Sequence, residues 1–309
     1  MSDLDKVLVT GASGFLGYSI CNDPKSIYGS TIGVSKSTRV PVGTKSYVAD
    51  ITDARSMHEI IAENSPTAII HTAARSIVRD CEINPGPAFQ VNVLGTINIL
   101  EAARQLQLDI PIVVLETDKV YGQQPKDCIP THERHELLGN SPYEYSKVMT
   151  AQVCEFYRNY YGMRIYSLRP ANLYGLHDMN LSRIVPGTFS KIKNGETPIV
   201  FTDSRTQLRE YVYVNDVVEI IGEMIAARPP AGAYNISSGE VMNPEQVIRE
   251  ILDATRSPLG INVVEKPFEF KEIHTQRLSG DKLDRNLGYQ FTPFKTAIAE
   301  IWSQMQKTA

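Results

Sequence analysis

Apolar stretches of strand length alternate with longer helical patterns through the first half of the chain, and this alternation limits the possible folds more than any other feature. Near-continuous apolar stretches occur at 6–10, 30–34, 46–49, 67–73, 111–117 and 164–171, and helical patterns occur at 53–64, 89–107 and 142–161. Strands that are apolar on both faces and joined by helices form parallel sheets covered on both sides. The sequence therefore predicts an α/β fold with a doubly wound parallel sheet of the Rossmann type.

The pattern becomes less regular after Pro170. We expect a helix near 181–194, short strands at 198–201 and 233–237, and two or three further helices toward the C-terminus. The predicted units are a Rossmann domain at 1–170, with returning segments near 209–237, and a smaller C-terminal α/β substrate lobe made mainly of 171–309.

The composition and charge exclude several classes of protein. The 309 residues carry a net charge of −4, which gives no electrostatic case for nucleic acid or an acidic membrane surface. No apolar run approaches the roughly 18 residues that span a bilayer, and the acidic start leads directly into a strand, so no signal peptide is expected. The four cysteines form no CxxC pair and the six histidines show no metal-binding spacing. We therefore expect a cytoplasmic protein without a metal site, a nucleic-acid partner or a membrane anchor.

The glycines of "VTGASGFLG" directly follow the first predicted strand and lead into the first predicted helix. Gly11 permits a tight turn, Gly14 lets the backbone approach a pyrophosphate, and Gly17 permits close packing of the helix on the sheet. The helix N-terminus adds N–H donors and the positive end of its dipole. The GxxGxxG spacing differs from the commoner GxGxxG, but the strand before it and the helix after it favour dinucleotide binding over a simple turn. Further cofactor contacts are expected from Ser13, Phe15, Leu16, Ile51 and Ala73.

The end of the second strand distinguishes the two nicotinamide dinucleotides. An acidic residue there favours NAD, but the segment "GVSKSTR" supplies Ser35, Lys36 and Arg39 instead. Hydroxyls and cations suit the 2′-phosphate of NADP, although the same residues also fit a solvated turn. Asp50 follows the third predicted strand and is placed to contact the adenine. NAD and NADP both remain candidates for a tightly bound cofactor.

The segment "NSPYEYSK" contains a helix start and a candidate catalytic pair. Ser141 caps the helix, Pro142 suits its first position, and Glu144 completes a capping box. Tyr143 and Lys147 then lie four residues apart on one helical face. A nearby ammonium and a helix N-terminus both favour the phenolate, so we expect the pKa of Tyr143 to be lowered toward that of a useful general base. A surface Tyr–Lys pair is the alternative.

Thr117 ends a predicted strand at the carboxyl edge of the sheet, where such folds bind their ligands. Its hydroxyl can bond to the substrate hydroxyl that Tyr143 deprotonates. Thr117, Tyr143 and Lys147 therefore suffice to oxidise a carbinol by hydride transfer to a nicotinamide. The two residues that follow, Asp118 and Lys119, are not needed for this step. Their plainest interpretation is a local ion pair that ends the strand.

Nine segments together resemble the extended short-chain dehydrogenase/reductase family of nucleotide-sugar epimerases and dehydratases. They are "TGASGFLG", "ADITD", "HTAA", "NVLGTINILEAA", "TDKVYG", "YEYSK", "LRPANLYG", "REYVYVNDVV" and "LSGDKLDRNLGY". The resemblance spans nearly the whole chain. It implies an enzyme with a Rossmann fold and a nicotinamide cofactor that Tyr143 and Lys147 also contact.

The order "TDK" at 117–119 resembles CDP-glucose 4,6-dehydratases and inverting UDP-N-acetylglucosamine dehydratases, whereas epimerases of the family more often carry small or neutral residues at the last two positions. The resemblance therefore implies a nucleotide-sugar 4,6-dehydratase. Once C4 is a ketone, Lys119 removes the C5 proton, if burial lowers its pKa, and Asp118 protonates the departing C6 hydroxyl. Hydride then returns to C6, so the cofactor ends unchanged.

Two other reactions and one inactive role remain as alternatives. Ser35 and Arg39 do not resemble the acidic signature of a retained NAD, so a nucleotide-sugar 4-epimerase or an NADPH-dependent 4-keto-sugar reductase also fits. A cofactor-binding scaffold without activity fits less well, because Tyr143 and Lys147 are both present.

The resemblance also implies a nucleotide-diphosphate sugar as substrate, bound mainly by the second lobe. The implied contacts are Arg75, Asn172, Arg183, Val185, Arg209 and Arg277. Arg209 and Arg277 match positions that bind the diphosphate, for which the forked guanidinium is suited. Asn172 matches a residue near the sugar and phosphate, and "SRIVP" matches the segment around the base.

Family members commonly pair two long helices between subunits as a four-helix bundle. The second of these helices, expected at 142–161, carries apolar residues beyond one narrow stripe, including Val148, Val153, Phe156 and Tyr157. We therefore predict a homodimer. The alternative is that both faces of the helix are covered within one chain.

Overall fold

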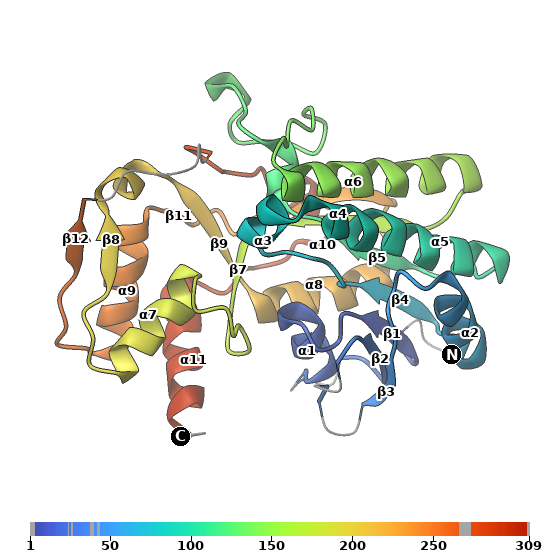
Figure 1. Ribbon diagram of the computed structural model, residues 1–309, viewed down its shortest axis with the longest axis horizontal. Coiled ribbons are helices and arrows are strands. Elements are labelled where there is room, and N and C mark those ends of the chain that lie inside the picture. The colour runs from blue at the N-terminus through green and yellow to red at the C-terminus, as the bar shows by residue number, and fades with distance from the viewer. Residues whose placement is uncertain are drawn as a thin grey trace.

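The structure is built around a seven-stranded parallel sheet (Figure 1). The computed structural model describes residues 4–23, 25, 27–37, 40–41, 44–265 and 273–307. The strands are β1 (Val7–Thr10), β2 (Thr31–Ser35), β3 (Lys45–Val48), β4 (Ala68–His71), β5 (Ile112–Leu115), β6 (Ile165–Pro170) and β10 (Gly232–Ile236). Their order is β10-β6-β5-β4-β1-β2-β3. The predicted doubly wound Rossmann fold is confirmed.

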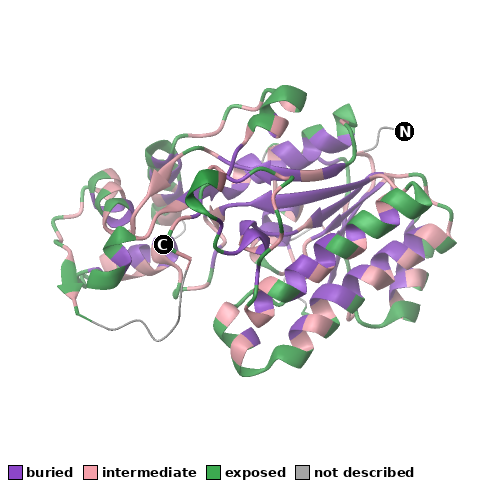
Figure 2. Cartoon of the chain, turned by 90° about the horizontal axis from the view of Figure 1, so that it is seen from above, coloured by how far each residue is buried: buried purple, intermediate pink, exposed green. Residues whose placement is uncertain are grey.

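Helices cover both faces of the sheet, as strands that are apolar on both faces require. The helices are α2 (Ala54–Asn64), α5 (Gly95–Gln105) and α6 (Pro142–Tyr161) on one face, and α1 (Phe15–Cys21) and α8 (Val214–Ala227) on the other. Alternate residues of β1 divide between the two layers, because Leu8 packs with α2 and α5 whereas Val7 and Val9 pack with α1 and α8. Figure 2 shows the resulting buried sheet between helices whose outer faces are exposed.

β3 differs from the buried strand expected at 46–49. Among the described strands it pairs with β2 alone and forms one edge of the sheet, and Val48 is 64% exposed. Its contact with α2 is polar, since Lys45 Nζ and Tyr47 Oη both donate to Glu63 Oε1. An edge strand has a neighbour on one side only, so it needs less apolar surface than a central one.

The long helix expected at 89–107 is divided. α3 (Val78–Ile83) and α4 (Pro85–Phe89) lead into a π-helical turn (Gln90–Leu94), and α5 follows. The wider turn contains Asn92, whose side chain accepts from the backbone N–H of Arg75 and donates to Ser146 Oγ, each at 2.8 Å. By contrast, α6 begins and ends at the predicted residues, and the capping box of Ser141 and Glu144 is present.

The described part of the second lobe combines short strands with helices. Its elements are β7 (Asn172–Tyr174), α7 (Ile184–Lys193), β8 (Ile199–Phe201), β9 (Arg209–Tyr213), β11 (Val241–Met242), α9 (Pro244–Thr255), β12 (Asn262–Val264), α10 (Asp281–Leu287) and α11 (Phe294–Lys307). β9 lies between β7 and β11, and β8 pairs with β12.

Parts of the second half return to the first domain. β10 pairs with β6 in the main sheet, and α8 packs against α1. Glu210 of β9 is fully buried and accepts from Ser237 Oγ, the Gly239 N–H and the Leu278 N–H, which ties these segments together. The domain boundary at residue 170 stays a prediction.

The chain leaves the carboxyl ends of β1 and β4 toward opposite faces of the sheet. Such a switch point opens a crevice, and α/β folds of this type bind ligands there. Within the described residues, no helix has the length and apolar character needed to cross a membrane.

Candidate active site

A cavity of about 780 Å³ extends along the carboxyl edge of the main sheet and into the second lobe. The predicted residues that line it are Gly11, Ser13, Gly14, Phe15, Leu16, Gly17, Ser35, Lys36, Asp50, Ile51, Ala73, Arg75, Thr117, Asp118, Lys119, Tyr143, Lys147, Asn172, Arg183, Val185 and Arg209. The structure thus brings together residues predicted for the cofactor, the chemistry and the substrate. Their individual roles remain predictions.

The two remaining predicted residues are Arg39 and Arg277. Arg39 lies outside the described residues. Arg277 lines a small neighbouring cavity, which shares Asp118 with the large one. Its backbone carbonyl accepts from the Thr131 N–H at 2.9 Å, so the segment around Arg277 is anchored beside the large cavity and not in it.

The glycine loop has the shape that the sequence predicts. Gly11 has a φ of +72°, and a Cβ added there would lie 2.7 Å from the backbone nitrogen of Ala73. A Cβ at Gly17 would lie 2.2 Å from the Gly11 carbonyl oxygen, so the helix could not approach the turn with any larger residue. Gly14 faces the cavity, and its Cβ would meet a single neighbour, the Gly11 oxygen at 3.2 Å. This cradle fits a pyrophosphate that approaches the backbone.

Lys36 and Asp50 form an ion pair at the β2 end of the cavity. Lys36 Nζ lies 2.6 Å from Asp50 Oδ2, and both side chains are partly exposed. Ser35 Oγ donates to the Ser37 carbonyl at 2.5 Å. The cation predicted for a 2′-phosphate is therefore already matched by an anion.

Thr117 and Tyr143 meet at the centre of the cavity. Thr117 caps the short 3₁₀-helix Asp118–Tyr121, and it hydrogen-bonds Tyr143. Burial raises the pKa of Tyr143 to about 12, although Thr117 and the charge of Arg183 oppose the shift. The expected lowering of this pKa is wrong for the ligand-free protein, because removal from water disfavours the phenolate more than its neighbours favour it.

Lys147 lies below Tyr143 on α6 and donates from Nζ to the Leu115 carbonyl at 2.8 Å. Burial lowers the pKa of Lys147 to about 8, and the carboxylate of Glu116 opposes this shift. Glu116 was not among the predicted residues, yet it lines the cavity. Its one signal in the sequence is a charge immediately before Thr117, at the end of an apolar strand.

Asp118 and Lys119 both reach the cavity, but they form a loose pair. Lys119 Nζ lies 3.6 Å from Asp118 Oδ1 and donates to Asn172 Oδ1 at 3.2 Å. Asp118 is almost fully buried, and Oδ1 accepts from Thr117 Oγ1 at 3.1 Å. Its Oδ2 has no hydrogen-bond partner within the described part of the chain. A buried acid and a half-buried amine thus lie beside the Thr117 hydroxyl.

Comparison with known proteins agrees with this geometry. The sequence pattern of the NAD dependent epimerase/dehydratase family matches residues 7–237. The chain belongs to this family. The prediction of an enzyme from the extended short-chain dehydrogenase/reductase group with a nicotinamide dinucleotide cofactor is therefore confirmed.

The relatives include both kinds of enzyme. A putative UDP-glucose 4-epimerase of Methanocaldococcus jannaschii is 29% identical over 273 residues, covering 85% of this chain and 86% of that protein. A dTDP-glucose 4,6-dehydratase of Xanthomonas campestris pv. campestris is 26% identical over 263 residues, covering 79% and 74%. The UDP-glucose 4-epimerase of Thermus thermophilus, solved in complex with NAD, has a TM-score of 0.88 at 25% identity, covering 98% of this chain and 100% of that one.

Replacing Gly14 by valine should weaken the binding of NAD and NADP by about a hundredfold or more while the fold is retained. A Cβ there has one close neighbour, so the added bulk projects into the cavity and not into packed structure. Calorimetric titration measures the affinity and circular dichroism the fold. Gly260→Val is the control, because a Cβ at Gly260 has no atom within 4 Å. Unchanged cofactor affinity in the Gly14 variant would refute the assignment of the loop.

Proposed function

We propose that this protein is a nucleotide-sugar 4,6-dehydratase. The observation that carries the proposal is that an acid and an amine, Asp118 and Lys119, line the same cavity as Thr117 and Tyr143. Oxidation of a carbinol uses Thr117 and Tyr143 together with Lys147, so Asp118 and Lys119 are available for a second reaction. Relatives named dTDP-glucose 4,6-dehydratase support this reaction class.

The glycine loop, Lys36 and Asp50 would hold the adenosine and pyrophosphate of the cofactor, and Tyr143 with Lys147 would border its nicotinamide. When bound, the nicotinamide would supply the hydride acceptor for oxidation at C4 and the hydride for reduction at C6. NAD is the cofactor named with the Thermus relative.

In the first step Tyr143 takes the proton of the C4 hydroxyl, and Thr117 orients that hydroxyl through a hydrogen bond. The Lys147 ammonium stabilises the phenolate that the step requires. Because burial raises the pKa of Tyr143 to about 12 even with the Thr117 hydrogen bond present, Lys147 must offset much of that shift for the base to act near neutral pH.

In the second step Lys119 is the base that removes the C5 proton, which the C4 ketone has made acidic. Asp118 is the acid that donates a proton to the departing C6 hydroxyl, so water leaves. Asn172 holds Lys119 Nζ at 3.2 Å, which directs the amine away from its partner carboxylate. Re-addition of a hydride at C6 and a proton at C5 completes the product.

The second lobe would bind the nucleotide diphosphate. Arg209 lines the cavity and suits the diphosphate. Arg183 also lines it, and Asp178 orients the Arg183 guanidinium at 3.2 Å. Arg277 would need to move from the neighbouring small cavity to reach the same ligand.

A 4-epimerase is the second candidate, because relatives of that name are 29% and 28% identical to this chain. It would use Thr117, Tyr143 and Lys147 in the same first step and return the hydride to the opposite face of C4. Asp118 and Lys119 would then have no chemical step.

Asp118→Asn and Lys119→Met should spare cofactor binding and C4 oxidation but slow water loss by about 10²–10⁴-fold. Tyr143→Phe should block the first hydride transfer, so no reduced cofactor appears in a single turnover. Purified protein is incubated with CDP-glucose, dTDP-glucose, UDP-glucose and UDP-N-acetylglucosamine in deuterated water, and mass spectrometry follows water loss and deuterium at C5.

The matched control is the exposed pair Lys126 and Asp127, changed to methionine and asparagine, which should leave water loss unchanged. Inversion at C4 without water loss or C5 exchange would identify an epimerase. Stoichiometric consumption of NADPH would identify a reductase. If dehydration survives the changes at Asp118 and Lys119, both residues only end the strand and have no role in the reaction.

Cofactor choice is tested with Lys36→Glu. If Lys36 leaves Asp50 to bind a 2′-phosphate, the new carboxylate should reduce the affinity for NADP relative to NAD by about tenfold or more. Titration of both cofactors gives the ratio. Lys45→Glu is the control, since Lys45 is exposed on the neighbouring strand and does not line the cavity. An unchanged ratio would remove Lys36 from phosphate binding.

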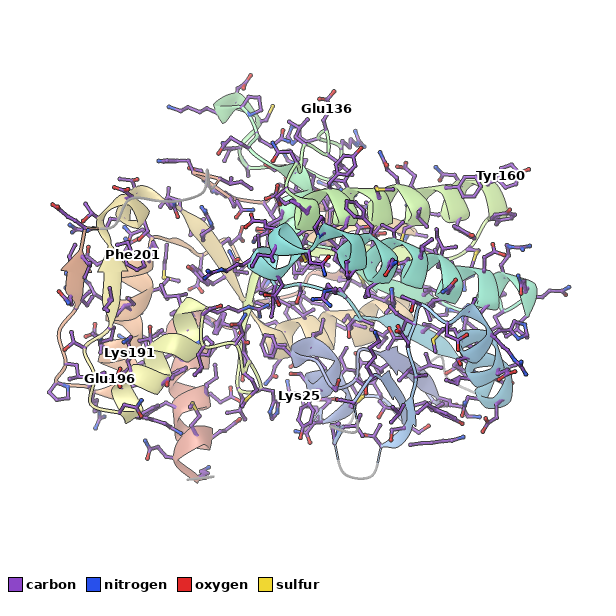
Figure 3. The ribbon with its side chains drawn as sticks, viewed as in Figure 1. Lys25, Glu136, Tyr160, Lys191, Glu196 and Phe201 are labelled. Atoms are coloured by element: carbon purple, nitrogen blue, oxygen red, sulfur yellow. The ribbon has the colours of Figure 1, made fainter. Side chains whose placement is uncertain are left out.

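We also propose a homodimer through α5 and α6. Val148 and Tyr157 are buried within the chain, but Phe156 is 51% and Tyr160 73% exposed, and their rings stack at 5.5 Å. Figure 3 shows Tyr160 on the outer side of α6. Light scattering at micromolar concentration should give the dimer mass, and Tyr160→Glu should shift it toward the monomer. Ile199→Glu, an exposed apolar residue of the other lobe, should not. A wild-type monomer would contradict the dimer.

A further inference from the structure

Glu116 is a buried carboxylate in the cavity wall that the proposed reaction does not use. It lies between Leu115, the last residue of β5, and Thr117, and its side chain is fully buried. Oε2 accepts from Arg169 Nε at 2.7 Å, whereas Oε1 has no hydrogen-bond partner among the residues that the structure describes. A buried oxygen left without a partner is destabilising, so it indicates a function.

Arg169 fixes the position of this carboxylate. It extends from β6, and its side chain is only 7% exposed. Its Nη1 donates to Tyr121 Oη at 2.9 Å and to the Glu133 carbonyl at 3.4 Å, while its Nε holds Glu116. With the guanidinium held on two sides, the Glu116 carboxylate cannot swing toward solvent.

Lys147 lines the same cavity as Glu116. Nζ donates to the carbonyl of Leu115, the residue immediately before Glu116, and an ammonium has two more N–H groups to donate. Burial disfavours the charged form, and Glu116 is the largest influence that favours it. Without this carboxylate, burial would still disfavour the charged form of Lys147, and the Arg169 cation would have no anion to balance it. Both effects would favour the neutral form of Lys147.

Other titratable groups around Lys147 do not supply a comparable negative charge. Cys154 on α6 and His71 on β4 interact with it. Burial raises the pKa of the Cys154 thiol, whereas burial and the charge of Lys147 lower the pKa of the His71 imidazole to about 3. Both groups are therefore neutral near pH 7. Tyr143, on the same helix, is also neutral in the ligand-free protein. Asp118 lies in the same cavity, but it is paired with Thr117 and Lys119.

We infer that Glu116 is a positioning residue of the active site, whose carboxylate, held by Arg169, keeps the Lys147 ammonium charged beside Tyr143. The inference rests on the proposed function for its catalytic meaning. Tyr143 loses its stabilising cation whenever Lys147 is neutral, so Glu116 extends the pH range of the first step upward.

The test measures the charge of Lys147 directly in the ligand-free protein. Lysine labelled with ¹³C at Cε is incorporated, and the Lys147 resonance is assigned by its loss in Lys147→Arg. In the wild type it should titrate with a pKa of about 8. In Glu116→Gln, which keeps the shape but removes the charge, the pKa should be lower by about one unit or more. An unchanged pKa would overturn the inference.

Asp216→Asn is the matched control. Asp216 is also a buried carboxylate with satisfied partners, including Thr292 Oγ1 at 2.7 Å, but it does not line the cavity. Its loss should reduce stability without moving the pKa of Lys147. If Glu116→Gln does not fold, the double variant Glu116→Gln/Arg169→Met removes both buried charges. It should lower the pKa of Lys147 by a smaller amount. An unchanged pKa of Lys147 in this variant would also refute the inference.

A second measurement connects the charge to catalysis. The alkaline loss of single-turnover cofactor reduction should move to lower pH in Glu116→Gln, by the same amount as the pKa of Lys147. The two proposals fail separately, because the titration needs no substrate. A shifted pKa in a protein that dehydrates no nucleotide sugar refutes the proposed reaction, whereas dehydration with an unshifted pKa refutes the role of Glu116.

Discussion

The parallel direction of all seven strands determines where the chemistry of this chain lies. Their carboxyl ends meet at one edge, so loops that follow β1, β4, β5 and β6 converge although they are far apart in the sequence. The glycine loop follows β1, Arg75 follows β4, Thr117 follows β5 and Asn172 follows β6. A capped helix, α6, then brings Tyr143 over the end of β5. The single strand direction thus assembles the part of the cavity wall that the main sheet contributes.

Within that wall, removal from water is the dominant influence on charge. It raises the pKa of Tyr143 and lowers that of Lys147, which is the wrong direction for both groups if one is to act as a phenolate and the other as an ammonium. The opposing contributions come from different elements: Thr117 and Arg183 act on Tyr143, and Glu116 acts on Lys147. A Tyr–Lys pair on one helix is therefore insufficient by itself, and the surrounding strands must supply the compensation.

Much of the fold and of the site could be predicted from patterns of residues that are close together in the sequence. Near-continuous apolar strands indicated the parallel sheet, the glycine spacing indicated the cradle, and Ser141, Pro142 and Glu144 fixed the start of α6 to the residue. The features that could not be predicted depend on the order of the strands in the sheet and on contacts between residues that are distant in the chain. β3 reads like a central strand, but its place at the edge follows from the sheet order.

The same limit applies to Glu116. It reads as an isolated charge in an apolar run, and its meaning depends on Arg169, which is 53 residues away on the neighbouring strand. Arg277 differs in that a motif match predicts a diphosphate contact, whereas the fold holds its segment beside a smaller cavity. The diphosphate contact stays a prediction.

The interpretation of Asp118 and Lys119 as a mere ion pair fits poorly with their geometry. A stabilising buried pair needs close contact and satisfied oxygens, because desolvation otherwise exceeds the attraction. Here Lys119 Nζ lies 3.6 Å from Asp118 Oδ1, Lys119 also donates to Asn172 of the other lobe, and Asp118 keeps a buried oxygen without a partner among the described residues. Such an arrangement costs stability, and costs of this kind are tolerated mainly at functional sites. In the proposed mechanism the cradle, Thr117 and the Tyr–Lys pair would take part in either reaction, so Asp118 and Lys119 are the groups that would separate a dehydratase from an epimerase.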